Sequence, residues 1–145
     1  MFNKLISTSD DVSLTILRVV LGVVFFVHGA QKLLGWFGGF GLAGTLGFMH
    51  QLGIPAPLAY LAIATEFFGG LGLIVGFLTR IPALGIAVDM IVAVFTVHYP
   101  NGFFMNWIGN QKGEGYEYHL LAIAMAAALL LRGAGRFSID RTLAK

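Results

Sequence analysis

Residues 12–34 read VSLTILRVVLGVVFFVHGAQKLL, an apolar stretch whose charged residues are Arg18 and Lys32. A helix needs about 20 predominantly apolar residues to cross the hydrocarbon core of a membrane, which is roughly 30 Å thick. The apolar residues are continuous and do not alternate with a period of two, so a helix is favoured over a barrel strand. This stretch therefore predicts a membrane-spanning helix.

Three further stretches of the same kind follow, at residues 57–78, 81–99 and 116–131. The whole chain is 57% hydrophobic and 11% charged, whereas a soluble domain has about 25% charged residues to face water. The mean hydropathy is +0.83. We therefore expect a single all-α domain over residues 1–145, an integral membrane four-helix bundle in the lipid bilayer.

The flanking charges predict how this bundle is oriented. Under four spans, six cationic residues fall on one side of the membrane and two on the other. The first group is Lys4, Arg80, Arg132, Arg136, Arg141 and Lys145, and the second is Lys32 and Lys112. Since cytoplasmic flanks carry the excess of Lys and Arg, both the N and C termini are predicted to be cytoplasmic.

The segment between the first two spans, residues 35–56, is apolar and rich in glycine. Within it Leu42, Leu46 and Met49 recur at helical spacing. This pattern predicts a short helix lying in the membrane interface.

Several classes of function are excluded by composition and motif context. The chain has no cysteine, so it forms no disulfide and no thiolate metal site of its own. Its cations are scattered at the span ends, so the net charge of +2 does not indicate a nucleic-acid surface. Gly39, Gly41 and Gly44 spell GxGxxG, but no strand precedes them, and no Walker A or GxSxG motif is present.

Ionisable residues inside the spans are costly and need partners, so they mark the interior of the bundle. Arg18 and Asp89 each lie on the order of 10 Å from the cytoplasmic end of their spans, at about 1.5 Å per residue. We predict that they form a structural ion pair between the first and third helices.

A second group of ionisable residues falls in the outer half of the bundle: His28, Lys32, Glu66 and His119. Glu66 can pair with Lys32 or accept a hydrogen bond from His28, and the four residues predict a cofactor-binding pocket. Nine residues separate His98 from Asp89, which places His98 on the opposite side of its helix, so it is left out of this site.

The sequence leaves three interpretations of these residues open. They form a structural network whose polar groups satisfy one another, a site for an organic cofactor or substrate, or a metal or haem site. No dense ligand motif such as HExxH is present. A metal or haem is therefore less favoured, and no metal ligands are assigned.

The chain resembles the DoxX family of small four-helix bacterial membrane proteins, from Leu17 onward. The resemblance is carried by Arg18, Gly22, His28-Gly29 and Lys32, by Glu66 followed by Gly69-Gly70-Leu71-Gly72, by Gly76-Phe77-Leu78-Thr79-Arg80, and by Gly133-Ala134-Gly135-Arg136-Phe137-Ser138-Ile139-Asp140. It implies a multi-pass protein of the bacterial plasma (inner) membrane, associated with redox processes. Some relatives are linked to sulfur-compound:quinone oxidoreduction and others to oxidative-stress complexes with partner enzymes.

Three functions follow as hypotheses. The first is a redox-associated subunit, such as a subunit of a quinone-linked oxidoreductase, that binds quinone in the outer half of the bundle and works with a partner redox protein. The second is a non-catalytic membrane anchor or assembly factor. The third is a small-molecule or proton-coupled transporter, for which a homo-oligomer could supply the pathway.

Overall fold

The computed structural model describes residues 2–144, and within that range it contains helices, turns and loops but no β-strand. This confirms the all-α class. The elements are α1 Phe2–Ile6, α2 Val12–Leu34, η1 Trp36–Gly38, α3 Gly41–Gln51, α4 Ala56–Ala64, η2 Thr65–Gly69, α5 Gly70–Val75, α6 Arg80–Ala93, η3 Val94–His98, η4 Tyr99–Asn101, α7 Glu117–Arg132 and α8 Ile139–Leu143.

Three continuous helical stretches are long and apolar enough to cross a membrane: Val12–Leu34, Ala56–Val75 and Arg80–Asn101, of 23, 20 and 22 residues. The second joins α4, η2 and α5, and the third joins α6, η3 and η4. Helix α7 has 16 residues and so a length of roughly 24 Å, shorter than the hydrocarbon core. That α7 is a fourth span therefore stays a prediction.

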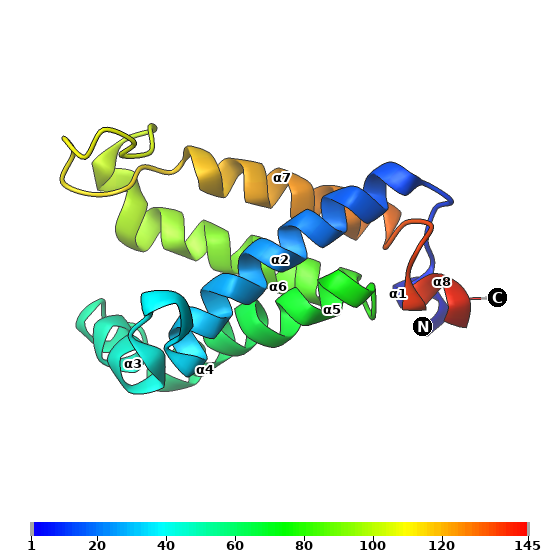
Figure 1. Ribbon diagram of the computed structural model, residues 1–145, viewed down its shortest axis with the longest axis horizontal. Helices are drawn as coiled ribbons and strands as arrows, with labels where there is room; N and C mark the ends of the chain where they lie inside the picture. Colours follow the sequence, from blue (N-terminus) through cyan, green and yellow to red (C-terminus); the bar gives the residue numbers. More distant parts are fainter. Residues whose placement is uncertain (1, 145) are drawn as a thin grey trace.

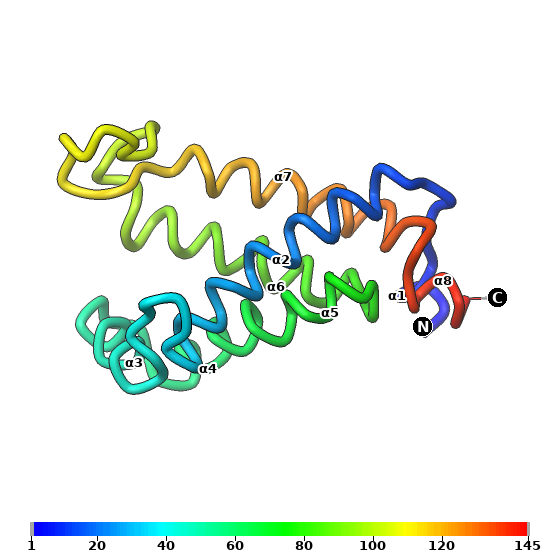
Figure 2. Tube along the Cα trace, viewed as in Figure 1, coloured from blue at the N-terminus to red at the C-terminus, as the bar shows by residue number. Residues whose placement is uncertain are grey.

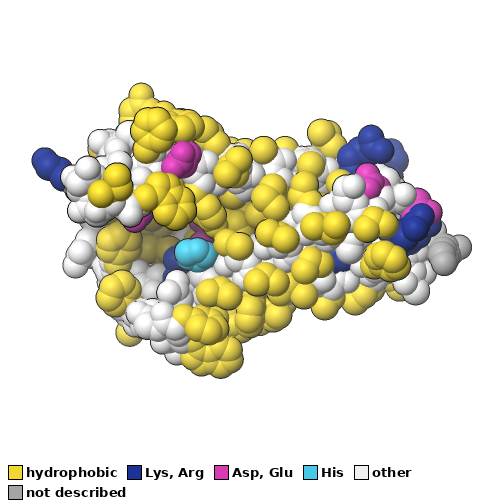
Figure 3. Space-filling model, turned by 45° about the horizontal axis from the view of Figure 1, so that its top comes forward, with side chains coloured by type: hydrophobic (Ala, Val, Ile, Leu, Met, Phe, Trp, Pro, Cys, Tyr) yellow, Lys and Arg dark blue, Asp and Glu magenta, His cyan; other side chains and the backbone are white. Residues whose placement is uncertain are grey.

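The long helices pack as a bundle with one apolar core (Figure 1). Helix α7 lies along α6, and α2 crosses α5 and η2. Phe25, Leu73, Ile86 and Leu129 are each no more than 1% exposed at the centre. Large apolar side chains also cover the outside along the length of the bundle, as Figure 3 shows. Such a surface suits contact with lipid.

The two ends of the bundle differ in what they carry (Figure 2). We call the end with α1, α8 and the 76–79 turn the terminal end, and the end with α3 and residues 102–116 the loop end. A helix, α3, is present where the sequence predicted one. Its place in the membrane interface, and the side of the membrane that each end faces, stay predictions.

At the terminal end the buried Arg18 is bonded to backbone carbonyl groups. Its Nε donates to the Ala134 oxygen at 2.9 Å, and its terminal nitrogens donate to Ile74 and Phe137, both at 2.7 Å, and to Leu73. Arg18 is 1% exposed. Because α5 ends at Val75, its last carbonyls lack the full set of partners inside the helix, and the guanidinium supplies further donors there.

This arrangement corrects the predicted Arg18–Asp89 ion pair, which is not formed among residues 2–144. The charge near Arg18 is instead that of Asp140. The Asp140 carboxylate accepts hydrogen bonds from the backbone of Leu78 at 2.6 Å and of Thr79 at 2.9 Å. That residues 133–144, after the last long helix, fold back onto the bundle was not predicted from the sequence.

A glycine is required at position 76, where residues 133–144 meet Arg18 of α2. Its φ of 71° is a left-handed conformation, and a Cβ there would lie 2.9 Å from the Arg18 guanidinium carbon. The stretches 76–80 and 133–140 therefore interlock around Arg18, which gives the motifs of those two stretches a shared structural role.

Candidate functional site

Lys32 and Glu66 form an ion pair at the loop-end half of the bundle. Lys32 lies in the last turn of α2, and Glu66 lies in η2, where its side chain is 4% exposed. One turn before Lys32, Gly29 lets the helices approach closely, because a Cβ at Gly29 would overlap the backbone of Phe67. The small residue on α2 thus determines how near the two charged groups come.

Asp89 of α6 completes a cluster with this pair. Its carboxyl group lies close enough to Glu66 and Lys32 to interact with the charges of both. Thr65 packs against Gly85, one turn earlier on α6, which brings η2 onto this helix. We call Lys32, Glu66 and Asp89 the ionic cluster. Two neighbouring carboxyl groups repel each other when both are ionised, so the cluster is a place where a proton can reside.

Glu66 and His98 both lie in π-helical turns, at Thr65–Gly69 and Val94–His98. Turns of this kind are rare, and they occur frequently at functional sites. A π turn holds more residues than an α turn, so it rotates the residues that follow about the helix axis.

This rotation corrects the position expected for His98. The His98 and His119 rings have centroids 4.0 Å apart, whereas uniform α-helical spacing placed His98 on the opposite side. The Nδ1 atom of His98 is also 2.8 Å from the Glu114 backbone oxygen. His98 therefore joins α6 to α7 at the loop end.

Two buried polar atoms near the histidines have no hydrogen-bond partner among residues 2–144. They are Nδ1 of His119, whose residue is 5% exposed, and the hydroxyl oxygen of Tyr118. The Tyr118 ring lies 6.3 Å from that of His28 and 5.4 Å from that of His119. Buried polar atoms are usually paired, so these two are the groups most available to a ligand.

A pocket of about 250 Å³ borders the ionic cluster through Lys32. Its other lining residues come from the end of α2 and from the α3 region: Gln31, Gly38, Gly39, Phe40, Thr45 and Phe48. Figure 3 shows the loop end hollowed, with a histidine side chain at the edge of the hollow. Within residues 2–144 no group of three or more His, Cys, Asp or Glu residues is arranged to hold a metal ion.

The structure therefore gathers His28, Lys32, Glu66 and His119 in one region. His28 lies at its exposed side, close enough to feel the charges of Lys32 and Glu66. Asp89, His98 and Tyr118 belong to the same region, and sequence reasoning did not assign them to it. The sequence signal that could have identified Tyr118 is its position directly before His119. A tyrosine near the end of a span is, however, equally typical of an aromatic residue at the membrane interface.

The chain has clear relatives among known proteins. Residues 13–99 match the DoxX family. A Bacillus subtilis (strain 168) protein named "Putative oxidoreductase CatD" is 33% identical over 121 residues, 83% of this chain and 81% of the relative. The Escherichia coli (strain K12) inner membrane protein YqjF is 30% identical over 136 residues, covering 94% and 95% of the two chains.

A second Escherichia coli (strain K12) protein, the inner membrane protein YphA, is 29% identical over 136 residues, or 90% of this chain and 89% of the relative. No solved structure matches the chain significantly. The membrane relatives agree with the three helices that are able to cross a bilayer. The chain is a multi-pass inner membrane protein, and it belongs to the DoxX family.

Proposed function

We propose that this protein is a redox-associated membrane subunit that binds a quinone at the loop end and works with a partner oxidoreductase. The observation that carries the proposal is the ionic cluster around the buried Glu66, which lies beside two buried atoms, on His119 and Tyr118, that have no hydrogen-bond partner among residues 2–144. The similarity to a relative named as an oxidoreductase supports the redox association.

The residues of the site fit the chemistry of a quinone. The carbonyl oxygens of a quinone accept hydrogen bonds, and Lys32, Tyr118 and His119 carry groups able to donate them. The Phe26 and Phe67 rings, with centroids 5.2 Å apart, offer apolar surface near Glu66. A bound quinone supplies the uptake of two electrons and two protons.

The chain's own contribution in this proposal is to bind the ring and to hold protons. Glu66 and Asp89 share a proton, Lys32 balances their remaining charge, and His28 stands at the exposed side of the site. Histidine exchanges protons near neutral pH and can return them from the water-facing edge. The electrons come from the partner oxidoreductase.

The proposal includes the orientation of the bundle, with α7 as the fourth span and both termini in the cytoplasm. The terminal end holds Lys4, Arg80, Arg132, Arg136 and Arg141, as the positive-inside rule requires of a cytoplasmic end. Because the chain has no cysteine, single-cysteine variants report each end cleanly. An impermeant thiol reagent added to intact cells should label Gln111→Cys at the loop end and leave Thr142→Cys unlabelled, and the reverse pattern would invert the orientation.

Quinone binding is tested by mass spectrometry of organic extracts from the purified protein. The wild type should carry a near-stoichiometric quinone, and Glu66→Gln should lose it while remaining a folded bundle. Arg136→Gln, which removes an exposed charge at the terminal end, is the control and should keep the quinone.

Two results would overturn the proposal. Quinone retained by Glu66→Gln at the wild-type level would remove Glu66 from the site. Phospholipid alone in every extract would favour the membrane anchor or assembly factor, in which the ionic cluster serves the packing of the bundle.

A further inference from the structure

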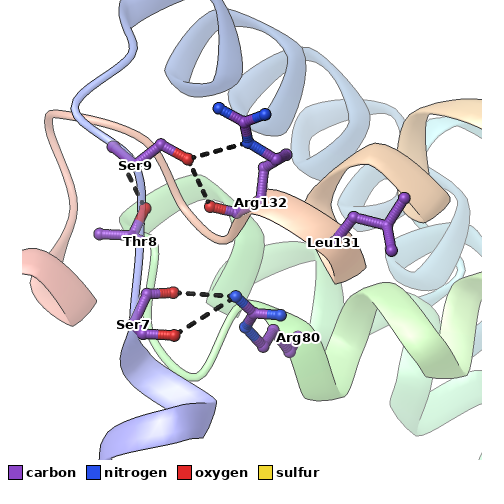
Figure 4. Close-up of a pocket in the computed structure, with 6 residues that line it drawn as sticks. All are labelled: Ser7, Thr8, Ser9, Arg80, Leu131 and Arg132. Atoms are coloured by element: carbon purple, nitrogen blue, oxygen red, sulfur yellow. Dashed lines mark hydrogen bonds between the residues drawn. The ribbon is translucent and has the colours of Figure 1, made fainter.

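A second pocket, of about 270 Å³, lies at the terminal end, far from the ionic cluster. Its lining residues come from three separate parts of the chain: Ser7, Thr8, Ser9, Arg80, Leu131 and Arg132. Figure 4 shows Arg80 of α6 and Arg132 of α7 both reaching the segment that follows α1.

This pocket is cationic, because the acidic residues of the terminal end are bonded elsewhere. Asp10 pairs with Arg136 at 2.6 Å and with Arg141 at 2.8 Å. Asp11 accepts from the backbone of Ser13 at 2.8 Å, and Asp140 is held by the 76–79 turn. Within residues 2–144 neither Arg80 nor Arg132 has an ion pair.

The two guanidinium groups also keep donors available. Arg80 bonds the Ser7 backbone oxygen at 3.1 Å and the Leu130 carbonyl, but its buried Nε has no hydrogen-bond partner in the described chain. Arg132 donates through Nε to the Ser9 hydroxyl at 3.3 Å, and its terminal nitrogens carry no dashed line in Figure 4. Guanidinium groups bind phosphate oxygens with paired donors.

The level of the pocket along the bundle, at the end of α7, indicates where its ligand comes from. Arg132 is the last residue of α7, and the preceding residue, Leu131, is 77% exposed. An exposed leucine beside a cation at the end of an apolar helix is expected where the hydrocarbon core meets the headgroups. Basic pockets between helices at this level bind the headgroups of anionic lipids.

We propose that Arg80 and Arg132 bind the phosphate of an anionic phospholipid in this pocket, beside residues 7–9. The lipid links α6, α7 and residues 7–9, and so holds the start of the chain against the bundle. The proposed orientation decides only which leaflet supplies the lipid. The site is independent of the quinone proposal, and Glu66→Gln should leave it unchanged.

Native mass spectrometry of the detergent-purified protein, mixed with equal amounts of phosphatidylglycerol and phosphatidylcholine, tests the site. The wild type should retain phosphatidylglycerol in preference to phosphatidylcholine. Arg132→Gln should reduce that preference roughly fivefold, since each arginine near the surface contributes about that factor to binding an anionic lipid. Arg132 is exposed, so its loss does not leave a buried group that would unfold the protein.

Arg136→Gln is the matched control, because it removes the same charge from the same end but does not line the pocket. It should keep the wild-type preference. An equal loss of the preference for phosphatidylglycerol in the two variants would show that net charge alone causes it, and would overturn the proposal. A wild type that does not distinguish the two lipids would overturn it as well. Displacement of phosphatidylglycerol by excess inorganic phosphate would assign the pocket to a soluble phosphate and equally overturn the lipid assignment.

Discussion

At the terminal end, the buried Arg18 bonds to backbone carbonyl groups, whereas at the loop end the buried Glu66 pairs with another side chain, that of the half-buried Lys32. The partners of Arg18 cannot gain or lose a proton, and the Asp140 carboxylate is held by two backbone N–H groups. The loop end instead places two carboxyl groups together and leaves polar atoms of His119 and Tyr118 without partners in the described chain.

The difference distinguishes buried charge that supports the fold from buried charge that is available for chemistry. Both kinds are expected to be expensive inside a membrane, so burial alone does not tell them apart. Fixed backbone partners satisfy a charge permanently, while titratable partners and unpaired donors can respond to a ligand or a proton.

The largest effect should come from Arg18→Met. This substitution removes the donors to Ala134, Ile74 and Phe137 and leaves their buried carbonyls unsatisfied. We expect a loss of about 3–5 kcal/mol in the free energy of unfolding. The measurement is denaturant unfolding in detergent, together with the proteolysis rate of residues 133–144. A wild-type unfolding free energy would show that the terminal end is not held by Arg18.

The second prediction concerns the close approach of α2 and η2. Gly29→Ala places a Cβ into the backbone of Phe67, so the helices must separate at the level of Lys32 and Glu66. The expected cost is about 1–3 kcal/mol.

Gly47→Ala in α3 is the control, because a Cβ there meets nothing within 4 Å. Alanine should stabilise that helix by up to about 1 kcal/mol. The two variants are compared by their Tm under identical conditions. Equal Tm values for Gly29→Ala and Gly47→Ala would mean that helix contact at Gly29 does not define the site.

The third prediction tests whether Glu66 and Asp89 act as a unit. Glu66→Gln and Asp89→Asn, alone and combined, form a double-mutant cycle read by denaturant unfolding. Either carboxylate can balance Lys32, so each single substitution should cost less than Arg18→Met. The double variant leaves Lys32 without a counter-charge and should show a coupling energy on the order of 1 kcal/mol. Strict additivity would separate Asp89 from the ionic cluster.

Much of the fold was accessible from the sequence because hydropathy acts over whole segments. The stretches containing Ile16, Leu61 and Phe95 read as membrane helices since lipid-facing and core positions are both apolar there. The pairing of Lys32 with Glu66 was one of two alternatives offered by their common depth. Depth along a helix follows from residue number, and the sequence supplies it directly.

The direction in which a side chain points about its helix axis is harder to predict from the sequence. The incorrect predictions for His98 and Asp89 arise from it. The π turn at Val94–His98 brings His98 onto His119, and no residue in it signals the extra residue per turn. Arg18 was assigned to Asp89 because depth matched, but the structure turns Asp89 toward Glu66. The carbonyls that bind Arg18 belong to the last turn of α5 and to the loop after α7, and backbone groups carry no residue-type pattern.

The smallest effect should come from the exposed ion pairs of the terminal end, where Arg136 and Arg141 both bond Asp10. The hydrogen bond from Arg136, aided by Arg141, lowers the pKa of Asp10 below its ordinary value of 3.8. A lowered pKa means that the ionised carboxylate stabilises the folded state. That contribution is complete above pH 3.8 and is lost as the pH falls through the lower pKa of the folded protein.

Asp10→Asn should therefore lower the Tm slightly at neutral pH, and the difference from wild type should vanish in acid and shrink in high salt. A difference in Tm that persists below the folded-state pKa would instead indicate that Asp10 acts through packing. The contacts of Asp10 would then resemble those of the buried Arg18, whose partners do not titrate.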